Sequence, residues 1–384
     1  MLVNKRKKWI IMLSVIVVLV LFVFSGMGFT EEIIPLKVPL AKKSLVIGWA
    51  PPDITPVFVS IGRAIEQEAK EAKRYGLDIK VITQACVEHT AFATQANIIE
   101  NFITSKVDVI VCSPIETGAI TPAINEAAKA GIPIIIVNIL ADIPEMHVDA
   151  YVGYDNTEAG RLAGAWAVNR LDGSGKIAMI EGIAGGWFST RRKAGFLSVT
   201  DVFPRIEIVG VRPGNWDRND SMVAAEHLLT ANPRIDLMFC ACDEILMGAL
   251  RAVESEGRGD EIIMQGYDGT QEALKALADG RSEADLTLHL PDWGRRSVQC
   301  GVMLVNGIKV PKFNDMMVEV VDKGNFSEYY PTPQMHWTHL KWIPTDWNRV
   351  LENPYTVFHP NWFEETGKEF PGDDKVRGMD VAPY

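Results

Sequence analysis

Short apolar runs alternate regularly with longer amphipathic stretches from Leu45 onward. In the first half of the chain, strand-like runs at 46–49, 79–83, 107–112 and 132–137 are separated by stretches with helical periodicity at 57–75, 93–105 and 117–130. The pattern then restarts, with strand-like runs at 148–153, 176–180, 206–211, 237–242, 262–267 and 284–288, each followed by a helical stretch. A last helix is expected at 292–306 and a last strand near 316–321. Nearly continuous apolar strands alternating with helices predict an α/β protein with two Rossmann-like lobes, each built on a parallel sheet covered on both faces.

Two such lobes, joined by several chain crossings, would turn the carboxyl ends of their strands toward a shared cleft. Ligands of open α/β sheets bind at these strand ends. We therefore expect the functional residues in the loops that lead from a strand to the next helix, which are 51–56, 113–116, 138–142, 184–192, 215–218, 242–244 and 267–270.

The first 28 residues have the order of an export signal. The basic run from Lys5 to Lys8 precedes an uncharged apolar run from Trp9 to Phe24, which small residues follow. This run is also long enough to cross a bilayer once, so a retained membrane anchor is the alternative to a cleaved signal peptide. Both interpretations place the remainder of the chain outside the cytoplasm, in the periplasm or another extracytoplasmic space.

Composition narrows the possible partners. The 384 residues include 38 Lys and Arg against 49 Asp and Glu, which gives a formal net charge of −11. Such an anion argues against a nucleic acid partner, because affinity for nucleic acid depends on neutralising phosphates with Lys and Arg. The glycine-rich motifs that hold nucleotide phosphates are absent from the sequence, and its seven His do not fall at metal-ligand spacing with Cys. We expect no cofactor and no metal. Five cysteines also argue against a disulfide scaffold, because one is always left over.

The composition changes after Tyr330 to Pro, Trp, His, Asn and Asp without strand or helix periodicity. This stretch is too aromatic for a disordered linker. We expect 331–384 to form an irregular extension that wraps the surface and packs through its Trp side chains.

Two acidic residues follow neighbouring strands of the second lobe. Asp268 stands in Gly266-Tyr-Asp-Gly-Thr270, where it is projected into the cleft and Thr270 is the expected N-cap of the next helix. Asp243 stands in Cys242-Asp-Glu244 and is expected to cap the helix that follows it.

A cation and several aromatic residues lie in the same set of loops. Arg192 is expected in the first turns of a helix, where a cation opposes the helix dipole and therefore has a use other than helix stability. Phe58, Trp187 and Trp216 lie in or beside the cleft loops. Aromatic faces suit the C–H face of a sugar, while Arg and Asp side chains suit its hydroxyls.

Taken together, these loops resemble those of the ribose-type periplasmic sugar-binding proteins, which share their two-lobed fold with the effector domains of LacI-type repressors. The resemblance covers roughly 44–330 and is carried by Gly153-Tyr-Asp-Asn156, Gly182-Ile-Ala-Gly185, Trp216-Asp-Arg218, Leu228-Leu-Thr-Ala-Asn-Pro233, Cys242-Asp-Glu244, Gly266-Tyr-Asp-Gly-Thr270 and Leu290-Pro291. It implies the type I periplasmic binding protein fold. Lobe 1 would then comprise 44–154 with 291–318, and lobe 2 would comprise 155–290 with 319–330.

The resemblance also implies a set of ligand contacts, which fall on Thr55, Phe58, Ser113, Asn138, Ile139, Arg192, Trp216, Cys242, Asp268 and His289. Four positions depart from the ribose pattern. The resemblance implies an Asp-Arg pair at the positions where this chain has Asn138 and Ile139. It implies Asn and Gln at the positions where this chain has Cys242 and His289. These departures remove several side chains that would hydrogen-bond the hydroxyls of ribose. The resemblance therefore does not imply that ribose is the ligand of this chain.

The expected function is that of an extracytoplasmic solute-binding protein, a monomer without catalytic activity that closes on a small sugar or polyol and delivers it to an ABC permease. One alternative is a sugar sensor that keeps the amino-terminal span. Another is a cysteine-dependent hydrolase that uses Cys242 and His289. A LacI-type repressor would need a helix-turn-helix before the first strand, where this chain has an apolar segment.

Overall fold

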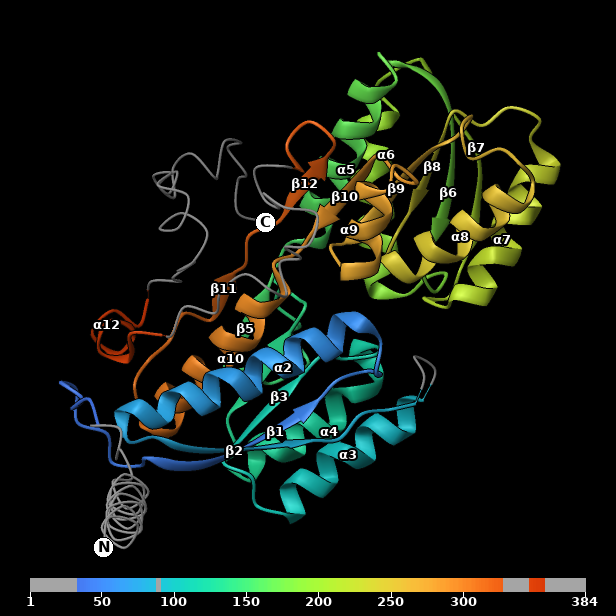
Figure 1. The fold of residues 1–384 in the computed structure, drawn as a ribbon. Helices are drawn as coiled ribbons and strands as arrows, with labels where there is room; N and C mark the ends of the chain where they lie inside the picture. Colours follow the sequence, from blue (N-terminus) through green and yellow to red (C-terminus); the bar gives the residue numbers. More distant parts are fainter. Residues whose placement is uncertain (1–32, 88–90, 327–344, 356–384) are drawn as a thin grey trace, which may run out of the picture.

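The computed structural model describes residues 33–87, 91–326 and 345–355, which form two sheets of six strands each, covered by helices (Figure 1). The first sheet has the strand order β11-β5-β4-β3-β1-β2. Its strands are β1 (Ser44–Ala50), β2 (Asp78–Thr83), β3 (Val109–Cys112), β4 (Ile134–Val137), β5 (Ala150–Gly153) and β11 (Phe313–Asp315). The helices around it are α2 (Pro56–Glu71), continued by the 3-10 turn η1 (Ala72–Tyr75), then α3 (Phe92–Thr104), α4 (Thr117–Lys129) and α10 (Leu290–Val305).

Both faces of the first sheet are buried. Along β3, Val109 and Val111 enter the apolar cluster that includes residues of α2 and α10, while Ile110 enters a second cluster with residues of α3 and α4. Successive residues of a strand point to opposite faces, so a sheet with helices on both sides needs apolar residues at every position. This is why the strands read as uninterrupted apolar runs.

The second sheet has the order β12-β10-β9-β8-β6-β7. Its strands are β6 (Ser174–Glu181), β7 (Arg205–Pro213), β8 (Leu237–Cys240), β9 (Ile263–Asp268), β10 (Ala284–Thr287) and β12 (Glu319–Asp322), and its helices are α5 (Asn156–Arg170), α6 (Trp187–Thr200), α7 (Arg218–Ala231), α8 (Asp243–Ser255) and α9 (Gln271–Ala278). The edge strand β12 pairs antiparallel with β10, so this sheet is not parallel throughout.

The predicted strand near 316–321 is present as β12 (Glu319–Asp322), shifted by a few residues and placed at the edge of the second sheet. The strand just before it, β11 (Phe313–Asp315), was not predicted and belongs to the first sheet, so the chain crosses between the sheets from 316 to 318. The backbone N–H of Met316 still donates to the carbonyl oxygen of Gly153 at 2.7 Å, while Glu319 already pairs with Thr287. The sequence pattern did not predict β11, because three residues are too few to show a period.

Part of the carboxyl-terminal extension is a short helix, α12 (Trp347–Glu352), which the absence of periodicity did not predict. Its N-cap Asp346 accepts hydrogen bonds from the backbone of Asn348 at 3.0 Å and of Arg349 at 3.3 Å. Trp347 is fully buried, which confirms the expected anchoring role for this tryptophan. The other tryptophans of the extension lie outside the described residues.

Long-range contacts fasten this segment to the first lobe. The side chain of Asn348 accepts from the backbone N–H of Lys37 at 2.8 Å and donates to the carbonyl oxygen of Pro35 at 3.1 Å. The hydroxyl of Thr345 donates to buried Glu68 of α2 at 2.8 Å. Two segments near opposite ends of the chain therefore meet beside α2.

The expected signal peptide or anchor at 1–28 lies outside the described residues. Across 33–87, 91–326 and 345–355, no helix is both long and apolar enough to cross a membrane.

Candidate functional site

A cavity lies between the two sheets and encloses about 570 Å³ of empty space, part of it open to solvent. Each of the seven predicted strand-to-helix loops supplies at least one lining residue, and the full lining is Pro52, Thr55, Val57, Phe58, Pro114, Ile115, Asn138, Phe188, Arg192, Trp216, Cys242, Glu244, Asp268 and Leu288. The cavity therefore has one wall from each lobe.

Arg192 is the buried cation of the cavity, and a close helix contact positions it. A Cβ atom at Gly160 of α5 would lie 2.2 Å from the carbonyl oxygen of Arg192, so only glycine lets α5 and α6 approach this far. The guanidinium then donates to Asn156 Oδ1 at 3.1 Å, to the carbonyl oxygen of Ala241 at 2.6 Å and to the hydroxyl of Tyr154 at 2.8 Å. Three of its five N–H groups are thus used inside the protein, which holds the remaining two in place.

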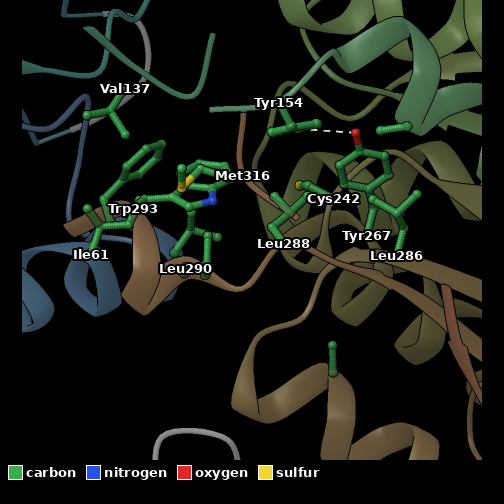
Figure 2. Packing of buried hydrophobic residues seen from close by; sticks show 14 of the residues in the cluster. Ile61, Val137, Tyr154, Cys242, Tyr267, Leu286, Leu288, Leu290, Trp293 and Met316 are labelled. Carbon is green, nitrogen blue, oxygen red and sulfur yellow. Dashed lines mark hydrogen bonds between the residues drawn. The ribbon is translucent and has the colours of Figure 1, made fainter. Parts of the chain in front are cut away.

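An aromatic network surrounds the guanidinium. The Arg192 guanidinium carbon lies 4.1 Å from the ring centroid of Tyr267 and 5.2 Å from that of Trp216. The hydroxyls of Tyr267 and Tyr154 are joined by a hydrogen bond of 3.1 Å, drawn as a dashed line in Figure 2. Burial raises the pKa of Tyr154 to about 12, so its hydroxyl keeps its proton at neutral pH.

Asp268 faces Arg192 across 3.6 Å and has an unusual backbone conformation. Its φ is 130°, a region that residues with a side chain rarely adopt, and φ of the next residue, Gly269, is 77°. Burial raises the pKa of the Asp268 carboxyl well above its usual value, and the nearby Arg192 only partly opposes this.

Asp243 holds the loop that carries Asp268, and the prediction that it caps its own helix is wrong. Its Oδ1 accepts from the backbone N–H of Tyr267 at 3.1 Å and its Oδ2 from that of Thr270 at 2.7 Å, while its own N–H donates to Asp268 at 3.4 Å. The N-cap of α8 is Cys242. Thr270 does cap α9, as predicted, by accepting from the N–H of Ala273 at 3.4 Å.

A second buried carboxyl, Asp285 of β10, lies behind Asp243. A Cβ at Gly266 would lie 2.4 Å from Asp285 Oδ2 and 3.0 Å from Asp243 Oδ1, so both carboxyls occupy the space that a side chain at this position would need. Burial raises the pKa of Asp285 to about 7 and that of Asp243 well above its usual value.

Asn138 is the main polar group on the wall of the first lobe. Its φ is 73°, and its backbone carbonyl accepts from the side chain of Asn156 at 3.2 Å. Its side-chain Oδ1 is buried and has no hydrogen-bond partner among the described residues. A buried acceptor of this kind is costly to leave unpaired, and here it lines the cavity.

Aromatic rings from both lobes line the cavity. Phe58 comes from α2 of the first lobe, while Phe188 and Trp216 come from the second. Gly182 makes room for the indole of Trp216, since a Cβ at that position would lie 2.0 Å from Cζ2 of the ring.

A family model described as the periplasmic binding protein domain matches residues 47–309. The chain belongs to this family. The expected family and the two-lobed fold are therefore confirmed. Among the relatives of this binding protein is the ribose import binding protein RbsB of Bacillus subtilis, which is 28% identical over 272 residues that cover 71% of this chain and 85% of the relative.

Two solved structures show the same likeness to the binding protein. An ABC transporter periplasmic solute binding protein from Actinobacillus succinogenes with bound D-allose matches with a TM-score of 0.70 and 28% identity, over 74% of this chain and 100% of that one. An ABC transporter solute binding protein from Bacillus halodurans with bound myo-inositol matches with a TM-score of 0.68 and 27% identity, over 76% and 99% of the two chains.

Most of the site residues expected from the sequence meet at the cavity. Seven of them are lining residues: Thr55, Phe58, Asn138, Arg192, Trp216, Cys242 and Asp268. Ser113 is fully buried beside lining residue Pro114, and its hydroxyl oxygen has no partner among the described residues. Trp187 packs edge-on against Phe188 at 5.0 Å and does not belong to the lining.

His289 is not a lining residue. Its φ of 46° turns the chain at the start of α10, and its Nε2 pairs with Glu319 Oε1 of β12 at 2.6 Å. Burial would lower the pKa of His289, but Glu319 raises it above its usual value. The neighbouring Leu288 lines the cavity instead.

This placement gives no support to a Cys242 and His289 nucleophile pair. Burial raises the pKa of the Cys242 thiol well above its usual value, whereas a reactive cysteine has a lowered one. His289 is occupied by Glu319. No group of three or more His, Cys, Asp or Glu within the described ranges could hold a metal ion.

Sequence reasoning missed several lining residues, namely Pro52, Val57, Pro114, Ile115, Phe188, Glu244 and Leu288. Six of the seven lie in or directly beside the predicted loops, so the loops located them even though no motif singled them out. Leu288 stands at the end of a predicted strand, one position before the residue to which the resemblance assigned the contact.

Proposed function

We propose that the protein is an extracytoplasmic solute-binding protein that captures a small sugar or polyol in the cavity between its lobes and delivers it to an ABC permease. One observation carries the proposal: polar groups with free capacity face the cavity from both lobes. Asn138 Oδ1 of the first lobe lacks a partner among the described residues, and Arg192 of the second lobe has two N–H groups left beside Asp268. A ligand with several hydroxyls can satisfy both walls at once.

The relatives agree with this class of ligand. The two solved structures have D-allose and myo-inositol bound, which are a sugar and a polyol. The aromatic rings of Phe58 and Trp216 come from opposite lobes and can pack against the C–H faces of such a ring.

In the proposed mechanism, ligand binding shifts the population from an open to a closed arrangement of the lobes. A ligand that contacts Asn138 on one side and Arg192 and Asp268 on the other binds the closed form better, and only such a difference in affinity can move the equilibrium. The hinge would consist of three crossings, at 154–156, 289–291 and 318–322. The lobe boundaries expected from the resemblance, 44–154 with 291–318 and 155–290 with 319–330, follow from these crossings and stay a prediction.

The revised ligand site comprises Thr55, Phe58, Ser113, Asn138, Arg192, Trp216, Cys242 and Asp268, with Phe188 and Leu288 added. His289 moves from the ligand site to the hinge, because it joins the start of α10 to β12. The protein would act outside the cytoplasm as a monomer, without catalysis.

The test is a thermal-shift screen of the purified protein against pentoses, hexoses, deoxy sugars and polyols, followed by calorimetric titration of the compounds that stabilise it. A ligand at a hundred times its Kd adds about 2.7 kcal/mol to the free energy of unfolding. If no compound of these classes raises the melting temperature, the sugar or polyol assignment is wrong.

Two variants locate the site. Asn138→Gly removes the side chain and tolerates the left-handed backbone, and it should weaken binding about tenfold. Arg192→Gln should weaken binding about a hundredfold, because it leaves Asp268 without its cation. Arg170→Gln is the matched control, since Arg170 pairs with Glu283 on the surface and lies outside the cavity. Equal affinities for the Arg192 and Arg170 variants would contradict the site.

A further inference from the structure

The polar groups that line the cavity are few, and two of them are already occupied. The hydroxyl of Thr55 donates to Asp53 Oδ1 at 2.7 Å. Both carboxylate oxygens of Glu244 accept from the guanidinium of Arg218, at 3.0 and 2.8 Å. The lining side chains with clear capacity for a ligand are therefore Asn138, Asp268 and the two remaining N–H groups of Arg192.

The wall formed by Cys242 and Leu288 has a different chemistry. Both residues line the cavity and are almost fully buried, at 6% and 1% exposure, and both are labelled in Figure 2. Burial keeps the Cys242 thiol protonated, and a thiol is a weak donor and a weak acceptor. Leu288 offers no hydrogen bond at all. A ligand hydroxyl at this wall would lose its water and gain almost nothing in return.

The chain has an apolar wall where the resemblance places two amide side chains. One of these amides is replaced by Cys242, and the other position is His289, which points to Glu319 and leaves the wall to Leu288. A CH2 or CH3 group fits such a wall, because it gains from leaving water and needs no partner. A buried hydroxyl without a partner costs enough to weaken binding about tenfold or more.

We propose that the ligand is a deoxy sugar or deoxy polyol, which presents adjacent hydroxyls to Asn138, Arg192 and Asp268 and a hydroxyl-free carbon to Cys242 and Leu288. This inference rests on the proposed function and narrows it to one subclass of ligand. Selectivity comes from the penalty on the extra hydroxyl more than from any contact unique to the deoxy compound.

The experiment compares compounds that differ by one oxygen atom. Isothermal titration calorimetry on the full chain would use the pairs D-fucose with D-galactose, L-rhamnose with L-mannose, and 2-deoxy-D-ribose with D-ribose. In at least one pair, the deoxy compound should bind at least tenfold tighter than its hydroxylated parent. If no pair shows at least tenfold tighter binding of the deoxy compound, including the case in which no pair member binds, the inference is overturned, while the proposed function stands as long as any sugar or polyol binds. If no member of any pair binds and no other sugar or polyol does, both are overturned.

Substitution of Cys242 gives an independent readout. Cys242→Asn supplies an amide at the wall and should reduce the preference for the deoxy compound at least fivefold, chiefly through tighter binding of the parent. Cys242→Ala keeps the wall apolar and is the matched comparison, in which the deoxy compound should still bind more tightly than its parent. An unchanged preference in a folded Cys242→Asn variant would overturn the role of this wall. If that variant does not fold, the wild-type pairs still decide the question.

Discussion

Glu68 offers a quantitative test of how the carboxyl-terminal extension joins the first lobe. Its side chain is completely buried on α2, where Oε2 accepts the hydroxyl of Thr345 at 2.8 Å. Burial raises the pKa of Glu68 from 4.5 to about 7, although Arg295 and the bond from Thr345 oppose this. The folded protein therefore binds this proton more tightly than the unfolded chain does.

The sign and size of the effect follow from proton linkage. Because the folded pKa lies above the unfolded one, the free energy of unfolding falls as the pH rises from about 4.5 to about 7 and then levels off. At about 1.4 kcal/mol for each pH unit, the full loss is about 3 kcal/mol. Glu68→Gln cannot ionise and keeps an oxygen that accepts from Thr345. The variant should therefore gain about 2 to 3 kcal/mol relative to wild type between pH 4.5 and pH 8.

The measurement is urea unfolding at pH 4.5, 6 and 8, followed by tryptophan fluorescence. Comparison with wild type at each pH cancels the titration of all other groups. Glu66→Gln is the matched control, since it removes one carboxylate from an exposed position of the same helix. If Glu68→Gln and wild type keep a constant difference in unfolding free energy across this range, the reasoning from burial is wrong.

Three further predictions concern the loop, the extension and the hinge. Asp243→Asn replaces one of the two carboxylate oxygens that accept backbone hydrogen bonds with an NH2 group, and it should weaken ligand binding about tenfold in calorimetric titrations. This loss of affinity should be smaller when Asp268 is also changed to Asn. An equal loss with and without Asp268→Asn would contradict a role of Asp243 through Asp268. Trp347→Ala should lower the free energy of unfolding by about 3 to 5 kcal/mol in urea titrations, and a loss below about 1 kcal/mol would show that the extension is not part of the core. Glu319 raises the pKa of His289, so this pair stabilises the folded protein below about pH 6.5, and the stabilisation is lost as the pH rises through the raised pKa. The free energies of unfolding at pH 6 and pH 9 should therefore differ less for His289→Gln than for wild type. An identical pH difference in the two proteins would refute the pairing.

The sequence alone predicted the features that depend on residues close together along the chain. Apolar runs such as β3 and β4 predicted buried parallel strands, because a strand covered on both faces needs apolar residues at every position. Turn chemistry predicted the cap at Thr270, since that hydrogen bond spans only three residues. The rule that ligands bind at strand ends located all seven loops around the cavity.

Only the tertiary structure decided features that join distant parts of the chain. Asp243 is within one residue of the helix end it was expected to cap, yet its carboxylate bonds to backbone groups of Tyr267 and Thr270. His289 itself has a left-handed backbone conformation at the start of α10, and its side chain pairs with Glu319. Leu288 lines the cavity in its place. Local periodicity carries no information about such partners, because burial and hydrogen bonding between segments are settled only when the sheets and helices pack together.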